Sequence, residues 1–166
     1  MNNNYNRFLG IILLLTAVAL NSCKKEKQDY LSDLLIKDQW QLGSVLEYHY
    51  LGDSQLSVDT IQCDATQIFK FNKDKTCAYT NFGCNAGTIS GNWSISGNRL
   101  YLISDLTVPD ATASGTSQPF INARINNLGD FSLVLETGDI QTYYTATDYR
   151  DIRRYGFVRV RTVSAE

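Results

Sequence analysis

The sequence predicts an all-β fold: an antiparallel, up-and-down barrel of about eight strands, with one short helix near the N-terminus. Apolar and polar residues alternate with a period of two over much of the chain, as in strands with one buried and one wet face. Turn signals rich in Gly, Asp and Asn separate these runs, and short connections favour antiparallel neighbours. A sandwich is the alternative all-β arrangement.

The elements follow from the spacing of apolar residues. Residues 30–37 predict one or two helical turns, because three leucines there share one helical face. From Trp40 to Tyr50 the period changes to two, which predicts a long first strand. The same alternation marks later strands at Ile89–Ile95, Ile121–Ile125 and Phe131–Leu135.

The N-terminal segment has the parts of a bacterial export signal that ends in a lipidation site. Arg7 precedes the apolar run Phe8–Leu20, and the small residue Ser22 stands directly before Cys23. The run is shorter than the ~20 apolar residues of a spanning helix. This arrangement resembles a lipobox, so we expect residues 1–22 to be removed and Cys23 to carry acyl chains. An uncleaved anchor with an incidental cysteine is the alternative.

The rest of the chain predicts one membrane-anchored domain in the cell envelope. Residues 23–29 form a lipidated, charged tether, and residues 30–166 have the length of one barrel domain. We expect the outer membrane, on its periplasmic or its surface face. The net charge of −2 gives no reason to expect a nucleic-acid partner. His49 is the single histidine and is expected to face water; without catalytic or metal-binding motifs, we expect no metal, no cofactor and no enzymatic activity.

The three cysteines of the domain predict one disulfide, since disulfides persist outside the cytoplasm. A four-residue hairpin loop at Asn72–Lys75 sets a register in which Cys63 lies opposite Cys84. Opposed strand residues have α-carbons ~4.5–5.5 Å apart, within the disulfide range. We therefore expect a Cys63–Cys84 bond, unless a bulge shifts the register, and a packed thiol at Cys77.

Five stretches of the chain carry motifs that occur together in a known family: Ile61–Asp64, Ile68–Thr76, Gly83–Cys84, Ile89–Ile95 and Leu100–Leu102. Together they resemble the lipocalin-like domain of lipoproteins from Bacteroidetes-type bacteria. That family typically shows a cysteine, a Phe-x-x-Asp-Gly hairpin, a second cysteine, a Gly-x-Trp and a Leu-x-Leu strand. Lys75 stands where the family has the hairpin glycine. The resemblance covers residues 31–104 and implies a lipocalin-like (calycin) barrel, but its motifs indicate fold more than function.

The resemblance also implies how one end of the barrel is closed. In lipocalins a tryptophan at the start of the first strand plugs that end and stacks with an arginine from a late strand. Trp40 takes this place, and Arg159 and Arg161 are the candidates for the arginine. The alternation of the last strand, however, predicts Val158 and Val160 as its inward residues.

The expected function is the binding of a small hydrophobic ligand, because an eight-stranded barrel is just wide enough for side chains or one such ligand. The residues expected to face inward and line the ligand site are apolar or aromatic: Leu42, Leu46, Tyr48, Phe69, Phe71, Trp93, Leu102 and Phe131. The alternative is that these side chains fill the barrel completely.

With a filled barrel, the chain would instead be a non-catalytic interaction module that docks envelope proteins or glycans. Four tyrosines near the last strands, among charged residues, suit such a surface: Tyr143, Tyr144, Tyr149 and Tyr155. A plain solvated connection is the simpler interpretation of this region. The small, polar segment Leu106–Gln118 is expected to be a lid over the barrel or a mobile surface loop.

Overall fold

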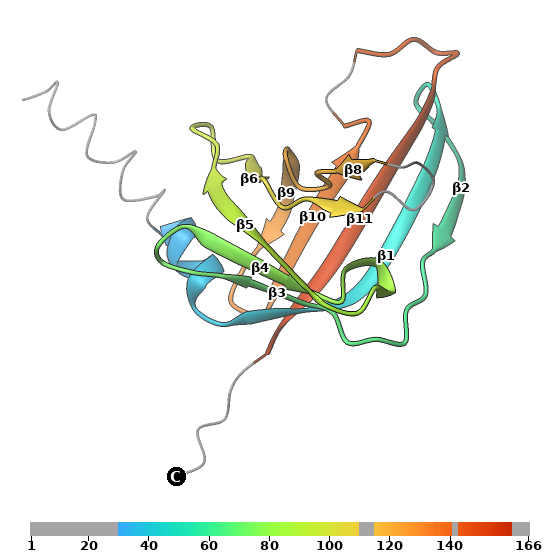
Figure 1. Cartoon of the computed structure of the whole chain (residues 1–166). Coiled ribbons are helices and arrows are strands. Elements are labelled where there is room, and N and C mark those ends of the chain that lie inside the picture. The colour runs from blue at the N-terminus through green and yellow to red at the C-terminus, as the bar shows by residue number, and fades with distance from the viewer. Residues whose placement is uncertain (1–29, 110–114, 141–142, 161–166) are drawn as a thin grey trace, which may run out of the picture. The chain divides into compact units, whose positions relative to one another are not determined.

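The structure, a computed structural model, describes residues 30–109, 115–140 and 143–160. Cys23 lies outside these residues, as do the expected signal peptide, the whole tether and Arg161. Residues from Leu34 onward form one compact unit. This unit is a closed antiparallel barrel, which confirms the predicted fold class (Figure 1). Residues 30–36 form a short helix, and no helix in the described part has the length and apolar character needed to cross a bilayer.

The barrel ring consists of β1 (Gln39–Leu51), β3 (Ile68–Phe71), β4 (Thr76–Thr80), β5 (Thr88–Ile95), β6 (Tyr101–Ser104), β9 (Ala123–Leu128), β10 (Ser132–Gly138) and β11 (Tyr149–Val160). Neighbouring strands are antiparallel, and pairing of β11 with β1 closes the ring. The remaining elements are β2 (Ser54–Thr60), the 3-10 turn η1 (Phe82–Cys84), and the small sheet of β7 (Val108–Pro109) and β8 (Thr116–Ser117).

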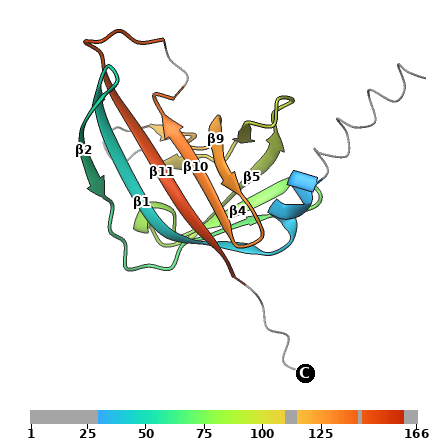
Figure 2. The ribbon, with the colours of Figure 1, turned by 180° about the vertical axis from the view of Figure 1, so that it is seen from behind.

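The long strand β1 has different neighbours at its two ends. Its first residues, Gln39–Gln41, pair with β3. Its second half, Leu46–Leu51, pairs with β2, which lies beside β1 at the margin of the sheet (Figure 2). The strand β11 runs along the other side of β1 over its whole length. The barrel thus has one end near Trp40, at the start of β1, and another near Leu51, at its finish. We call the first the closed end and the second the open end, for the reasons given below.

Trp40 and Arg159 close the first of these ends. The Trp40 side chain is fully buried, and the guanidinium carbon of Arg159 lies 4.4 Å from the centroid of its ring. Arg159 Nη2 also donates to the backbone oxygens of Leu34 (2.9 Å) and Gly129 (3.1 Å). The stacking implied by the lipocalin resemblance is thus present. Val158 is 52 % exposed, so the prediction that it faces inward is wrong.

Aromatic rings fill the barrel between its two ends. Relative to the fully buried Phe69, ring centroids lie at 4.1, 5.0, 5.2 and 6.1 Å for Phe71, Tyr79, Phe120 and Phe157. Phe120 belongs to the segment before β9, yet it is fully buried. These distances are those of rings in direct contact. The interior is therefore a packed core and not an empty calyx.

The ends of the segment Leu106–Gln118 are part of this packing, although residues 110–114 lie outside the described part. Leu106 is fully buried and Val108 is 6 % exposed. Val108 also pairs with Ser117 across the β7–β8 sheet. The Leu106–Val108 end of this segment therefore packs against the barrel, whereas residues 115–118 at its other end are exposed.

A β-bulge in β1 reverses which of its residues face the barrel interior. The register between β1 and β11 shifts at Gly43, so that Val45, and not its neighbour Leu46, lies opposite the buried Tyr155. Because successive strand residues point to opposite faces, one extra residue exchanges the two faces. Leu46 and Tyr48 therefore lie on the outer face, and the prediction that they face inward is wrong. The inward residues beyond the bulge are Val45, Glu47 and His49.

The β3–β4 hairpin differs by one residue from the predicted register, since Phe71 pairs with Cys77. Lys75 has a left-handed φ of 70°, in the place where the similar family has its hairpin glycine. The Cys63–Cys84 disulfide forms as predicted, with α-carbons 5.7 Å apart. Both cysteines lie beyond the paired strands, so the hairpin shift does not separate them. Cys77 is a buried free thiol, as predicted.

Candidate functional site

The open end of the barrel contains a cavity of about 520 Å³. Its lining comes from β1, β10, β11 and the segments that flank β9 and β10, and includes Glu47, Thr137, Asp139, Asp151, Arg153 and Tyr155. These side chains are polar or charged, and Pro119, Ile121 and Ile140 add apolar surface to the same lining. The bulge at Gly43 places Glu47, and not Leu46, in the lining of this cavity.

Glu47 and Arg153 form an ion pair across the floor of this cavity. The two residues lie directly opposite each other on β1 and β11, and Arg153 Nη2 donates to Glu47 Oε1 at 2.6 Å. Burial opposes the charge of Arg153, but Glu47 and Tyr155 together outweigh burial and raise the pKa of the guanidinium. Arg153 Nε is buried and has no hydrogen-bond partner among the described residues. Tyr155, 3 % exposed, lies beneath them, and burial raises the pKa of its phenol.

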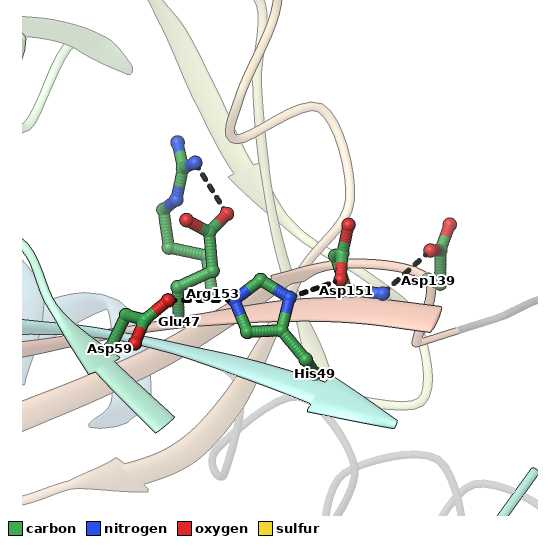
Figure 3. A network of polar contacts seen from close by, with 6 residues as sticks. All are labelled: Glu47, His49, Asp59, Asp139, Asp151 and Arg153. Atoms are coloured by element: carbon green, nitrogen blue, oxygen red, sulfur yellow. Dashed lines mark hydrogen bonds and ion pairs between the residues drawn. The ribbon is translucent and has the colours of Figure 1, made fainter. Parts of the chain in front are cut away.

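His49 connects three strands at the rim of the cavity (Figure 3). Its Nδ1 lies 2.6 Å from Asp151 Oδ1 on β11, and its Nε2 lies 3.2 Å from Asp59 Oδ2 on β2. The bond to Asp151 is the main cause that raises the pKa of the imidazole above its ordinary value; desolvation opposes it, and Asp59 adds to it. Both carboxylates are hydrogen-bond acceptors, so the protonated imidazole can donate to Asp151 and Asp59 at the same time. His49 is part-exposed, and the two carboxylates fix its ring at the edge where water was expected.

Asp139 adds a further carboxylate to the cavity. It follows Gly138, whose φ of 91° suits glycine and whose missing Cβ lets the backbone carbonyl of Asp151 approach closely. Asp139 Oδ2 accepts a hydrogen bond from the backbone N–H of Asp151 at 2.9 Å. The lining thus contains three carboxylates, those of Glu47, Asp139 and Asp151, against the one guanidinium of Arg153. The cavity therefore favours a ligand that brings hydrogen-bond donors or positive charge.

On the outside of the same strands, a second polar cluster has a structural role. Glu136 is 2 % exposed and accepts hydrogen bonds from Arg124 and Arg154, the latter through Nε at 2.9 Å. Burial works against its ionisation, but the two arginines outweigh burial and lower the pKa of the Glu136 carboxyl. Arg154 Nη1 also donates to Tyr48 Oη at 3.1 Å, and its guanidinium lies 4.7 Å from the Tyr48 ring. Tyr48 is thereby held on the outer face.

The predicted tyrosine cluster is only partly assembled. Tyr143, Tyr144 and Tyr149 line a second cavity of about 440 Å³ beyond the end of the barrel. Tyr144 Oη donates to Asp53 Oδ1 at 2.7 Å, and the guanidinium of Arg150 lies 3.4 Å from its ring centroid. Tyr155, which was expected in the same cluster, is buried inside the barrel instead.

The eight residues predicted to line an apolar ligand site do not lie together. Leu46 and Tyr48 are on the outer face, as described above. Four lie in the packed core, each at most 3 % exposed: Phe69, Phe71, Trp93 and Leu102. Leu42 precedes the bulge and lies opposite Phe157. Phe131 is 64 % exposed because it lies in the turn before β10, where the strand alternation has not begun, so its inward prediction is wrong. Neither the cavity of about 520 Å³ nor that of about 440 Å³ is lined by any of these side chains.

The sequence interpretation missed Glu47 and Asp139, and it placed Arg153 among the charged residues of the tyrosine surface and not inside the barrel. One signal was available: a glycine inside a strand often marks a bulge, and Gly43 stands within the first strand. The inward position of Glu47 follows from that bulge, and that of Arg153 from its pairing with Glu47. Asp139 had no comparable signal, since an aspartate after a glycine is ordinary in turns.

The polar cavity shows no arrangement typical of a metal centre. In the described part of the chain, no three His, Cys, Asp or Glu side chains are grouped so that they could hold a metal ion.

Comparisons with protein-family models and with curated proteins found no match for this chain.

Proposed function

We propose that this protein is a lipid-anchored binding module of the bacterial cell envelope, and that it holds a small polar ligand in the open end of its barrel. The observation that carries this proposal is the contrast along the barrel axis. Aromatic rings fill the closed end and the middle, whereas the open end leaves about 520 Å³ with four charged side chains in its lining. Cavities of this volume suit small molecules.

The ligand class follows from the lining. A fatty acid would place methylene groups against Glu47, Asp139 and Asp151 and would remove their hydration without replacing it. A molecule with amine or hydroxyl donors would satisfy the same carboxylates. An acceptor group on that molecule would meet the guanidinium of Arg153, whose side chain is 41 % exposed. We therefore place a small amine or amino sugar ahead of the hydrophobic ligand expected from the fold.

The proposed role is binding without catalysis. His49 is the side chain most suited to proton transfer, but each of its ring nitrogens is held by a carboxylate, Asp151 on one side and Asp59 on the other. A general base needs a nitrogen within hydrogen-bond reach of the ligand. The arrangement supports a structural role for His49, in which it fixes the rim of the cavity.

The ligand proposal is tested by titrating the protein with glucosamine, putrescine and a fluorescent fatty-acid analogue, with binding followed by protein-observed NMR. We expect glucosamine or putrescine to shift signals around Glu47 and Asp139, and we expect Asp139→Asn to weaken that binding several-fold. The matched control is Asp130→Asn, an exposed aspartate on the β9–β10 turn. Saturable binding of the fatty-acid analogue, with no response to either amine, would contradict the proposed ligand class.

The anchoring proposal rests on the sequence pattern before Cys23 and has its own test. Changing Cys23 to Ala should move the protein from the membrane fraction to the aqueous fraction, because acyl chains contribute roughly 0.8 kcal/mol for each buried methylene. Cys77→Ala is the control, because this buried thiol has no part in anchoring. Membrane retention of the Cys23→Ala protein would overturn the lipid anchor.

A further inference from the structure

The strand β2 has an open edge. All seven of its residues, Ser54–Thr60, are exposed. Among the described strands β1 is its only partner, and both ribbon views show β2 at the margin of the sheet with β1 on one side (Figures 1 and 2). Such an edge presents a row of backbone N–H and C=O groups to any strand that can align with it.

This edge lacks several of the features that usually discourage pairing. Proteins often protect open edges with lysine, proline, inward charges or very short strands. The sequence of β2, SQLSVDT, has no lysine, arginine or proline, and its apolar residues Leu56 and Val58 are 56 % and 40 % exposed. A register shift near Tyr50 disturbs the pairing with β1 beside the hairpin turn, but Ser57–Thr60 pair regularly with it.

The direction of the free backbone groups follows from one hydrogen bond. The backbone N–H of Ile61, just beyond β2, donates to the carbonyl of Val45 on β1 at 2.9 Å. Backbone groups alternate between the two sides of a strand, so those of Asp59 also face β1. Those of Val58 and Thr60 must then point toward the open edge.

We propose that the occupant of this edge is the β2 strand of a second copy of the chain, aligned antiparallel with Val58 on the two-fold axis. In this register Val58 meets its own counterpart on the outer face, and the two residues exchange backbone hydrogen bonds. Ser57 lies opposite the partner's Asp59, so that each hydroxyl can donate to a carboxylate. A two-fold axis at Asp59 would place like charges directly opposite each other, which is unfavourable. The strand is therefore complementary to itself in the proposed register.

The resulting contact is self-matching and closed, as in most symmetric dimers. One short strand pair buries little area, so the dimer is expected to be weak in solution. Anchoring two copies in one membrane would raise their effective concentration and favour pairing. Substitutions at Val58 leave the cavity lining unchanged, because Val58 pairs with Tyr48 on the outer face.

A charge-swap experiment tests the proposal on the full chain in detergent, with mass measured by sedimentation at several protein concentrations. Val58→Lys and Val58→Glu should each dimerise more weakly than the wild-type protein, because each places like charges across the axis. We expect the dimer dissociation constant of each variant to rise about tenfold or more. Mixing the two variants should restore a dimer that contains one copy of each. Val58 is part-exposed, so both variants are expected to keep the fold, which circular dichroism checks.

Cysteine cross-linking locates the axis independently. Directly opposed residues in such a pair have α-carbons about 5.5 Å apart, within the disulfide range. Val58→Cys should therefore form a covalent dimer on mild oxidation, whereas Ser54→Cys, exposed at the other end of the strand, should not. The domain's own free thiol, Cys77, is buried and does not compete. Equal cross-linking at both positions, or a monomeric wild-type protein with no rescue on mixing, would overturn the proposal.

Discussion

Replacing Phe120 with alanine tests whether the barrel is filled. Phe120 is fully buried, and its ring centroid lies 5.1 to 5.9 Å from those of Phe69, Tyr79 and Tyr155. Core Phe→Ala changes cost about 3–5 kcal/mol of unfolding free energy, and the cost is larger where the surroundings cannot collapse into the space. Strands tied together in a closed barrel collapse poorly, so we expect about 4 kcal/mol.

The assay is urea denaturation of the detergent-solubilised protein, followed by tryptophan fluorescence and circular dichroism. In a thermal melt of a domain of this size, the same loss of unfolding free energy would lower the melting temperature by roughly 15 °C. Phe131→Ala is the matched control: it removes the same atoms from a side chain that is 64 % exposed, and should change stability by less than about 1 kcal/mol.

The same substitution should also create a binding site. A dry, apolar space of roughly the size of a phenyl ring binds small aromatic molecules. The Phe120→Ala protein should therefore bind benzene or indole, and the wild-type core should not. The filled-barrel reasoning is refuted if Phe120→Ala costs no more than Phe131→Ala, or if the wild-type protein binds indole equally well.

Three further predictions concern the polar groups and the disulfide. Replacing both Cys63 and Cys84 by serine should cost about 3 kcal/mol of stability, since the bond closes a loop with a sequence separation of 21, and denaturation with and without reductant measures this loss. The raised pKa of His49 implies that its stabilising contribution is present at low pH and is lost as pH rises through the folded pKa; NMR titration should show Asp151→Asn lowering that pKa, and no change would contradict the bridge. The lowered pKa of Glu136 has the opposite sign: its contribution is present above the unfolded carboxyl pKa and is lost as pH falls through the folded value, so Glu136→Gln should flatten the acid limb of a stability–pH curve.

Much of the fold could be predicted because it depends on local regularities. Period-two alternation identifies strands wherever one face is buried, and short polar turns force neighbouring strands to be antiparallel. The Cys63–Cys84 pairing was predicted correctly although the predicted hairpin register was off by one residue. Both cysteines lie in connections beyond the paired residues of the hairpin, so the register of the strands does not fix their separation. The position of Trp40 at the closed end was implied by the resemblance to lipocalins, and its side chain is fully buried.

The candidate site could not be predicted in the same way, because its residues are selected by register and not by local pattern. Leu46 and Glu47 are equally compatible with an alternating strand, and only the bulge at Gly43 decides which of them faces inward. Phe120 comes from a stretch with weak alternation, and nothing local indicates that it enters the core. Its burial removes the apolar calyx that the strand pattern alone suggested.

The amino-acid sequence by itself therefore determined an all-β fold of antiparallel strands and the disulfide partners, whereas the closed barrel and the tryptophan that plugs one end were implied by the resemblance to lipocalins. The tertiary structure alone decided that the barrel core is filled and that its open end is polar. The physical reason is that strand period is encoded within a few neighbouring residues, whereas the face that each residue occupies depends on every residue counted before it. One added residue in β1 exchanges the two faces and brings Glu47, instead of Leu46, into the cavity.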